Sequence, residues 1–143
     1  MTERPAVVIA METDDTGELR KAILSGLFSY NDQIAGPMHN SVLIISARDH
    51  DHTFVGGLIV NFQPGWKWMH LQWIWIAESH RRAGIGRRLV EVAEREGEKR
   101  GCLHAAVDTF QAREFYEKLG YSVYGVMEDY PAGHRRFHMR KTF

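Results

Sequence analysis

Hydrophobic and polar residues recur with two different periods along this chain, and each change of period marks a predicted element. Apolar or alternating runs predict strands at residues 6–11, 41–47, 53–62, 67–76, 103–107, 121–127 and 135–141. Apolar residues at helical spacing predict helices at residues 17–30, 84–100 and 111–119. Residues 67–107 therefore form a strand–helix–strand unit, which we expect to be a right-handed crossover between two parallel strands. The pattern predicts an α/β fold with a mixed sheet of six to seven strands flanked by helices.

The strand predicted at residues 67–76 has two different faces. Alternation places His70, Gln72, Ile74 and Ile76 on one face, and Met69, Leu71, Trp73 and Trp75 on the other. The second set is uniformly large and apolar, so we expect it to face the core. The first set begins with two polar groups and leads into a turn, which makes its face the candidate for chemistry.

That strand leads into a glycine turn with arginines on both sides: Arg81, Arg82, Gly84, Gly86, Arg87 and Arg88. The first N–H groups of the following helix lack partners, and the helix dipole there attracts anions. Cations at this end are unfavourable, so the arginines indicate an anionic ligand; a solvated basic rim is the alternative. A P-loop is excluded because Arg87 follows Gly86, and a dinucleotide fingerprint is excluded because position 89 is leucine.

The run Arg81-Arg-Ala-Gly-Ile-Gly86 resembles Arg/Gln-x-x-Gly-x-Gly/Ala, a signature of the GNAT family of N-acetyltransferases. Residues 112–121, Ala-Arg-Glu-Phe-Tyr-Glu-Lys-Leu-Gly-Tyr, are similar to the second hallmark of that family. The resemblance is most complete over residues 53–143. It implies the GNAT acyl-CoA N-acyltransferase fold in a single domain over residues 1–143. In that fold the parallel fourth and fifth strands splay apart, and the acetyl-pantetheine arm lies between them.

The resemblance also implies which residues bind acetyl-CoA, with the turn holding its pyrophosphate. These cofactor-binding residues are Ile74, Trp75, Ile76, Arg81, Arg82, Ala83, Gly84, Ile85, Gly86, Arg87, Asp108, Thr109 and Tyr116. Backbone N–H groups near Trp75 and Ile76 would polarise the thioester carbonyl. Thr109 stands where many members carry an asparagine that bonds the pantetheine arm, so either Thr109 or its neighbour Asp108 is expected to replace that contact.

Three residues are candidates for catalysis. The resemblance implies that Tyr116 protonates the departing thiolate; an ordinary packing residue is the alternative. His70 is the candidate base, because a neutral imidazole accepts protons well near pH 7; a merely hydrogen-bonded histidine is the alternative. Gln72 lies on the same face and is able to position His70 or a relay water.

These residues predict an N-acetyltransferase that moves an acetyl group from acetyl-CoA to a primary amine of a small molecule or peptide by direct attack. A non-catalytic acyl-CoA-binding sensor with the same fold is the alternative. Dimers are common among members of the family, so a homodimer is a further expectation.

Composition narrows the class of protein. The 143 residues contain 18 basic and 18 acidic side chains, so no net charge favours nucleic acid as a partner. The N-terminus lacks the form of a signal peptide and no apolar run is long enough to span a membrane, which predicts a cytoplasmic protein without a membrane partner. The run Asp49-His-Asp-His52 predicts a solvated turn rather than a metal site, and Cys102 a packing residue.

Overall fold

The computed structural model describes residues 4–13 and 16–143. It divides into two compact units, one ending at Ala35 and one spanning Gly36–Phe143. Among the described residues, no helix combines the length and the apolar character needed to cross a bilayer.

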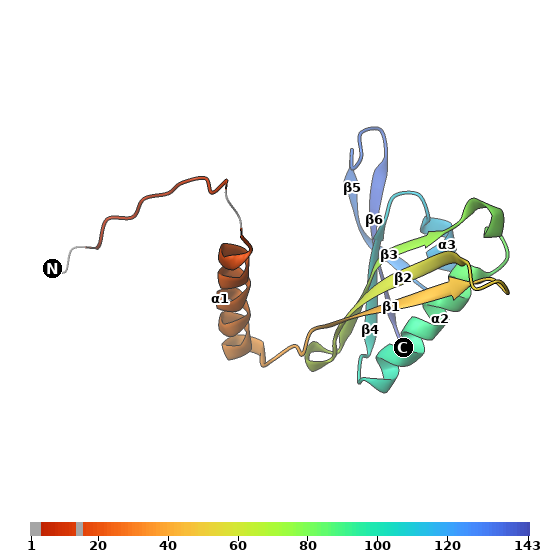
Figure 1. Ribbon diagram of the computed structural model, residues 1–143, viewed down its shortest axis with the longest axis horizontal. Coiled ribbons are helices and arrows are strands. Elements are labelled where there is room, and N and C mark those ends of the chain that lie inside the picture. The colour runs from red at the N-terminus through yellow and green to blue at the C-terminus, as the bar shows by residue number, and fades with distance from the viewer. Residues whose placement is uncertain (1–3, 14–15) are drawn as a thin grey trace. The chain divides into compact units, whose positions relative to one another are not determined.

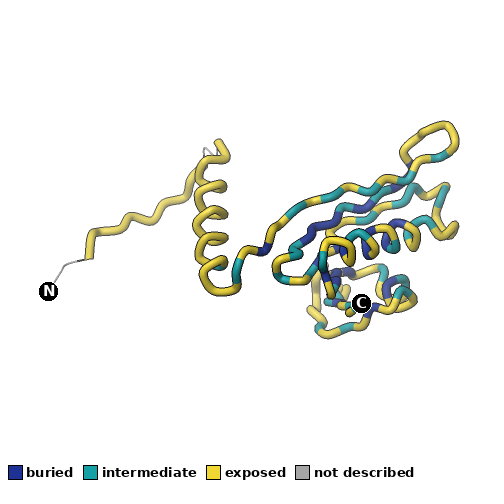
Figure 2. Tube along the Cα trace, turned by 90° about the horizontal axis from the view of Figure 1, so that it is seen from below, coloured by how far each residue is buried: buried dark blue, intermediate teal, exposed yellow. Residues whose placement is uncertain are grey.

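The first unit contains one described helix, α1, which spans Glu18–Ala35. The helix continues five residues beyond the predicted end at residue 30, so the connection to the next strand is confined to residues 36–40. Gly36 and Pro37 end the helix, as such residues commonly do. When the first unit is considered by itself, every α1 residue except Asn31 is exposed (Figure 2).

The strand predicted at residues 6–11 is wrong. This segment has no regular secondary structure, and its apolar side chains are exposed, Ile9 to 94%. A strand requires a neighbouring strand to pair with its backbone N–H and C=O groups. The described part of the first unit offers a helix instead, so the apolar composition of this segment alone is not enough to form a strand.

Residues 36–143, which are fully described, form a six-stranded mixed sheet in the order β1-β2-β3-β4-β6-β5. The strands are β1 (Ser41–Arg48), β2 (Phe54–Gln63), β3 (Trp68–Ile76), β4 (His104–Thr109), β5 (Ser122–Glu128) and β6 (Arg135–Thr142). The helices are α2 (Ile85–Lys99) and α3 (Arg113–Lys118), with single 3-10 turns η1 (Pro64–Trp66) and η2 (Glu78–His80). Neighbouring strands are antiparallel except β3 and β4, which are parallel. The predicted α/β fold with one parallel pair is confirmed.

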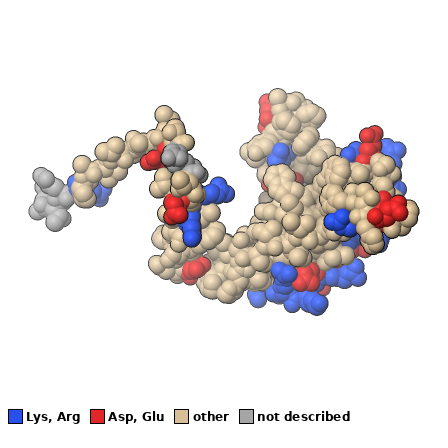
Figure 3. All heavy atoms as spheres, in the orientation of Figure 1, with Lys and Arg blue, Asp and Glu red and all other residues tan. Residues whose placement is uncertain are grey.

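Helix α2 covers one face of the strands β1–β3 (Figure 1). Its buried residues Leu89, Val90 and Ala93 join the side chains that project from that face of the sheet, among them Phe62 and Met69. The opposite, polar side of α2 carries charged residues, as expected for an amphipathic surface helix. Acidic and basic side chains lie close to one another on the face shown in Figure 3.

Two smaller predictions are confirmed. Residues 49–52 form the turn between β1 and β2, where the Asp49 carboxylate accepts hydrogen bonds from the N–H groups of Asp51 and Thr53. Cys102 is a core residue whose thiol donates to the carbonyl of Trp68 at 3.3 Å. Burial raises the pKa of the Cys102 thiol, which disfavours the reactive thiolate.

The predicted faces of β3 hold only as far as Leu71. Met69 and Leu71 are buried as expected, but Trp73 is 71% exposed and Trp75 is 53% exposed. The register with β2 shifts between Ile59 and Val60, so that Leu71 and Trp73 pair with consecutive β2 residues. This bulge leaves Gln72 unpaired and reverses the alternation beyond it. Ile74 and Ile76 consequently pack against the core, and both tryptophans turn to the other face.

Candidate active site

The segment between β3 and α2 forms a tight turn with two left-handed residues. Arg82 has φ 62°, and Gly84, the N-cap of α2, has φ 77°, a conformation that glycine adopts without strain. The Arg81 side chain donates from Nε to the carbonyl of Ile76 at 2.9 Å, which fixes the turn to the end of β3. The predicted strand–turn–helix order is thus confirmed in detail.

This turn presents backbone N–H groups without partners. Within the described residues, no hydrogen bond is formed by the N–H groups of residues 82–87, and the first α2 bond begins at Arg88, which donates to Gly84. Of the nearby arginines, Arg87 forms an exposed ion pair with Glu91 at 2.9 Å. Arg82 and Arg88 have no carboxylate within 4 Å in the described chain. Unpaired amides beside cationic side chains fit a diphosphate.

The parallel strands β3 and β4 separate next to this turn. Their register contains only three pairs, Trp68 with His104, Met69 with Ala105 and His70 with Ala106, although both strands continue further. Beyond His70 the strands enclose a cleft of about 570 Å³, within the range typical of small-molecule sites. The predicted splay of this strand pair is therefore present.

The cleft brings together six of the predicted site residues: His70, Gln72, Ile74, Asp108, Thr109 and Tyr116. The remaining ones, Trp75, Ile76 and residues 81–87, lie at the end of β3 and in the turn. The two groups are linked through Gly86, where an added Cβ would meet the Phe115 ring at 3.1 Å. Because Phe115 precedes Tyr116 on α3, this close approach places the turn beside the helix that carries Tyr116.

Backbone directions at the end of β3 refine the predicted thioester contact. The N–H of Ala77 donates to Val55 of β2 at 2.8 Å. Successive N–H groups in a strand point to opposite edges, so Trp75 directs its N–H to β2 as well. Ile74 and Ile76 then direct theirs toward the side where β4 has separated. Of the two predicted donors, Ile76 is the one whose N–H faces the gap.

Tyr116 is 3% exposed and lines the cleft from α3. Its ring packs edge-on against Phe115 and Tyr121, with centroids 4.9 and 5.8 Å away. Burial raises the pKa of Tyr116 to about 12. The phenol is consequently protonated throughout the physiological range, as a proton donor must be.

His70 lies across the cleft on β3. Removal of water by neighbouring atoms lowers the pKa of His70 from its ordinary 6.5, and the negative charge of Asp108 opposes this shift. The imidazole is therefore neutral near pH 7 and able to accept a proton. Gln72, the bulge residue, lines the same cleft.

Asp108 and Thr109 are both engaged by other groups. Asp108 Oδ1 lies 2.7 Å from Nδ1 of His138, which stands opposite it on β6. Thr109 is buried, and its Oγ1 accepts a hydrogen bond from the N–H of Ala112 at the start of α3. The contact of either residue with a pantetheine arm stays a prediction.

Among the cleft residues that sequence reasoning missed are Asn61, Tyr124, Arg136 and His138. Asn61 is buried with an unpartnered Oδ1, and the Tyr124 ring lies 6.0 Å from that of His138. The available signal was the alternation Arg136-Phe-His138, which places both polar residues on one face. Recognising it would have required the knowledge that β6 lies beside β4.

This chain is similar to known acetyltransferases. The sequence matches the acetyltransferase (GNAT) family over residues 10–121. It is 32% identical over 128 residues to acetyltransferase Atu2258 of Agrobacterium fabrum, covering 88% of this chain and 92% of that protein. It is 41% identical over 81 residues to blasticidin-S acetyltransferase of Streptomyces morookaense, covering 54% and 58%. A crystal structure of an acetyltransferase from Bacillus cereus superposes with TM-score 0.82 at 27% identity, covering 94% and 98%.

Proposed function

The chain belongs to the acetyltransferase (GNAT) family, and we propose that it transfers the acetyl group of acetyl-CoA to a primary amine of a small molecule. One observation carries this proposal: the unpartnered amides of residues 82–87 lie beside a cleft that holds a neutral histidine and a protonated tyrosine. An anion site next to a base and an acid is what thioester aminolysis requires.

The proposed reaction is a direct attack. His70 accepts a proton from the ammonium group of the acceptor, directly or through a water held by Gln72, and so frees the nitrogen lone pair. The nitrogen forms a bond to the acetyl carbonyl carbon while the N–H of Ile76 donates to the carbonyl oxygen. As the carbon–sulfur bond breaks, Tyr116 donates its proton to the leaving sulfur. The nitrogen then gives its second proton to the Tyr116 phenolate through water, and His70 releases the first proton to solvent. The products are an N-acetyl amine and free CoA.

The amides of residues 82–87, with Arg82 and Arg88, are the groups that would hold the diphosphate of acetyl-CoA. Their lack of partners in the described chain supports this assignment. Asp108, Thr109, Ile74 and Trp75 are the proposed contacts along the pantetheine arm. Such binding would place the thioester in the gap between β3 and β4.

The proposal is tested by measuring thiol release from acetyl-CoA with a panel of primary amines. Blasticidin S belongs in the panel because a relative named for its acetylation is 41% identical over 81 residues. We expect CoA to raise the melting temperature and at least one amine to release thiol. Protection by CoA without turnover on any amine would indicate a sensor, and no protection would contradict the site itself.

Replacement of His70 by glutamine is expected to lower kcat/KM at pH 7 by about 10²-fold, the usual contribution of a general base. Because the pKa of His70 is lowered, the wild-type acidic limb should have its midpoint below pH 6.5. Protonation below that midpoint removes the base, so activity falls as the pH falls. His70→Gln should remove this limb from the pH–rate profile.

The matched control is His104→Gln, which changes a histidine that is bonded to Thr142 and does not line the cleft. This variant should keep the wild-type profile. An unchanged acidic limb in His70→Gln would place the base elsewhere. Loss of that limb in His138→Gln would then identify His138 as the base.

A further inference from the structure

Arg136 of β6 is a cation inside the cleft that lacks an anionic partner. Its guanidinium lies 3.9 Å above the centroid of the Tyr130 ring, and its Nε is buried without a hydrogen-bond partner. Among residues 4–13 and 16–143, no carboxylate lies within 4 Å of it. A buried N–H of a charged group is unfavourable unless something accepts its hydrogen bond.

The neighbouring groups show that the missing counterion of Arg136 is a property of the cleft rather than of the strand end. Arg135, one residue earlier, is exposed and forms an ion pair with Glu128 at 3.2 Å. The Asp108 carboxylate, on the neighbouring strand of the cleft wall, is bound to His138. The structure therefore provides a counterion for the exposed arginine and none for the arginine of the cleft.

The sheet register places Arg136 relative to the reacting groups. Asp108 pairs directly with His138, and Arg136 lies two residues along β6 on the same face. Such diagonal positions are about 7–8 Å apart across an antiparallel pair. Asp108 also acts electrostatically on His70. The β4–β6 wall of the cleft thus carries a negative charge near the candidate base and, two positions along, a guanidinium.

Stacking on Tyr130 does not use the hydrogen-bonding capacity of Arg136. An aromatic ring takes the flat face of a guanidinium and leaves the N–H groups in its plane available. These form a rigid fork that matches the two oxygens of a carboxylate or of a phosphate. The stack therefore orients a donor set for a planar or tetrahedral oxyanion.

We propose that Arg136 binds an oxyanion of the acceptor, so that the substrate is an amine that also carries a carboxylate or phosphate. This inference rests on the proposed function and assigns its acceptor class. The acceptor nitrogen lies toward His70 and Asp108, and the anionic group lies toward β6. Plain alkylamines and polyamines, which offer no anion to Arg136, are poor acceptors.

The test compares pairs of amines of which one carries an anionic group and the other does not. At saturating acetyl-CoA, amino acids are assayed beside their methyl esters, and phosphoethanolamine beside ethanolamine. Wild-type protein should prefer the anionic member of at least one series, and the series in which it does so identifies carboxylate or phosphate. Arg136→Gln should lower kcat/KM for that member by about 10- to 100-fold, mainly through KM, as expected for one charge-assisted contact. Arg136→Lys should recover part of the loss.

Arg135→Gln is the matched control, because it removes the same charge from the adjacent, exposed position outside the cleft. It should leave both members of each pair unchanged. Equal losses for the anionic and neutral members in Arg136→Gln would show a structural role and overturn the inference. So would a wild-type protein that treats both members alike.

Direct binding separates this inference from the proposed reaction. Calorimetric titration of the CoA-bound protein with the same amines requires no turnover. Binding of the anionic member that is lost in Arg136→Gln, without acetylation, would support the oxyanion site and contradict the transferase. Turnover of neutral amines only would support the transferase and contradict the oxyanion site. The absence of anion preference in both assays would also contradict the oxyanion site.

Discussion

Tyr116→Phe is expected to lower kcat by about 10²-fold, because the variant retains the ring and loses the proton that the leaving sulfur requires. The ring is 3% exposed and packs against Phe115 and Tyr121, so phenylalanine should occupy the same space. Affinity for acetyl-CoA should be largely retained. Because the pKa of Tyr116 is raised to about 12, ionisation of the phenol should not limit wild-type activity at neutral pH. Steady-state thiol release at saturating substrates measures the effect.

The control for this variant is Tyr121→Phe. Tyr121 is equally buried and its hydroxyl is enclosed, but it does not line the cleft. Removing that hydroxyl should leave kcat close to the wild-type value. Wild-type kcat in Tyr116→Phe, or an equal loss in both variants, would remove Tyr116 from the mechanism.

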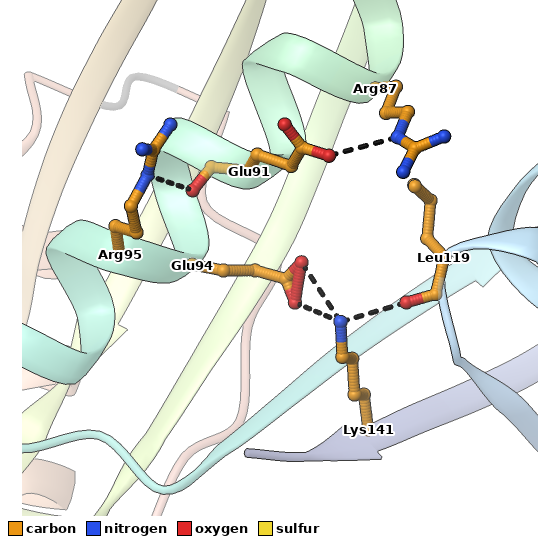
Figure 4. A network of polar contacts seen from close by, with 6 residues as sticks. All are labelled: Arg87, Glu91, Glu94, Arg95, Leu119 and Lys141. Carbon is orange, nitrogen blue, oxygen red and sulfur yellow. Dashed lines mark hydrogen bonds and ion pairs between the residues drawn. The ribbon is translucent and has the colours of Figure 1, made fainter.

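The second large effect is expected for stability, at the contact between α2, β6 and the end of α3. Lys141 Nζ lies 2.8 Å from Glu94 Oε2 and donates to the carbonyl of Leu119 at 2.8 Å (Figure 4). The side chains of Glu94 and Lys141 are 10% and 27% exposed. Lys141→Met would leave the Glu94 carboxylate buried without a cation. We expect the free energy of unfolding to fall by about 3 kcal/mol, at the lower end for a buried pair because Lys141 is partly solvated.

A double variant distinguishes the loss of a pair from the loss of packing. Glu94→Leu combined with Lys141→Met should be more stable than Lys141→Met alone, since no unpaired charge remains. Arg87→Met, which breaks the exposed pair with Glu91 in the same view, should cost under about 1 kcal/mol. Denaturant unfolding of the three variants measures these differences. Equal losses in the two single variants, or no recovery in the double, would contradict the explanation.

Local patterns predicted most of the second unit because its elements have local causes. The strand–turn–helix of residues 67–100 was readable from alternation, Gly84 and Gly86, and the helical spacing that follows them. The resemblance to the GNAT family, together with the polar face of residues 67–76, predicted that Tyr116 and His70 belong to one site, and the structure places both in one cleft. Their roles in the reaction remain predictions.

The errors have a different origin. The residues at 6–11 have the composition of a strand, but a strand also requires a neighbour, which composition does not specify. The bulge at Gln72 depends on how β2 pairs with β3, so simple alternation assigned Trp73 and Trp75 to the wrong face. The contact between Asp108 and His138 joins residues 30 positions apart and depends on the adjacency of β4 and β6.

The short ladder between β3 and β4 has a mechanical consequence. With three residue pairs between them, the β1–β3 half of the sheet and the β4–β6–β5 half share little backbone hydrogen bonding. A ligand arm with amide groups of its own, lying in the gap, would hydrogen-bond to strand groups that β3 and β4 do not pair with each other. Under the proposed function, bound acetyl-CoA would connect the two halves of the sheet, so that they are most firmly joined while the reaction takes place.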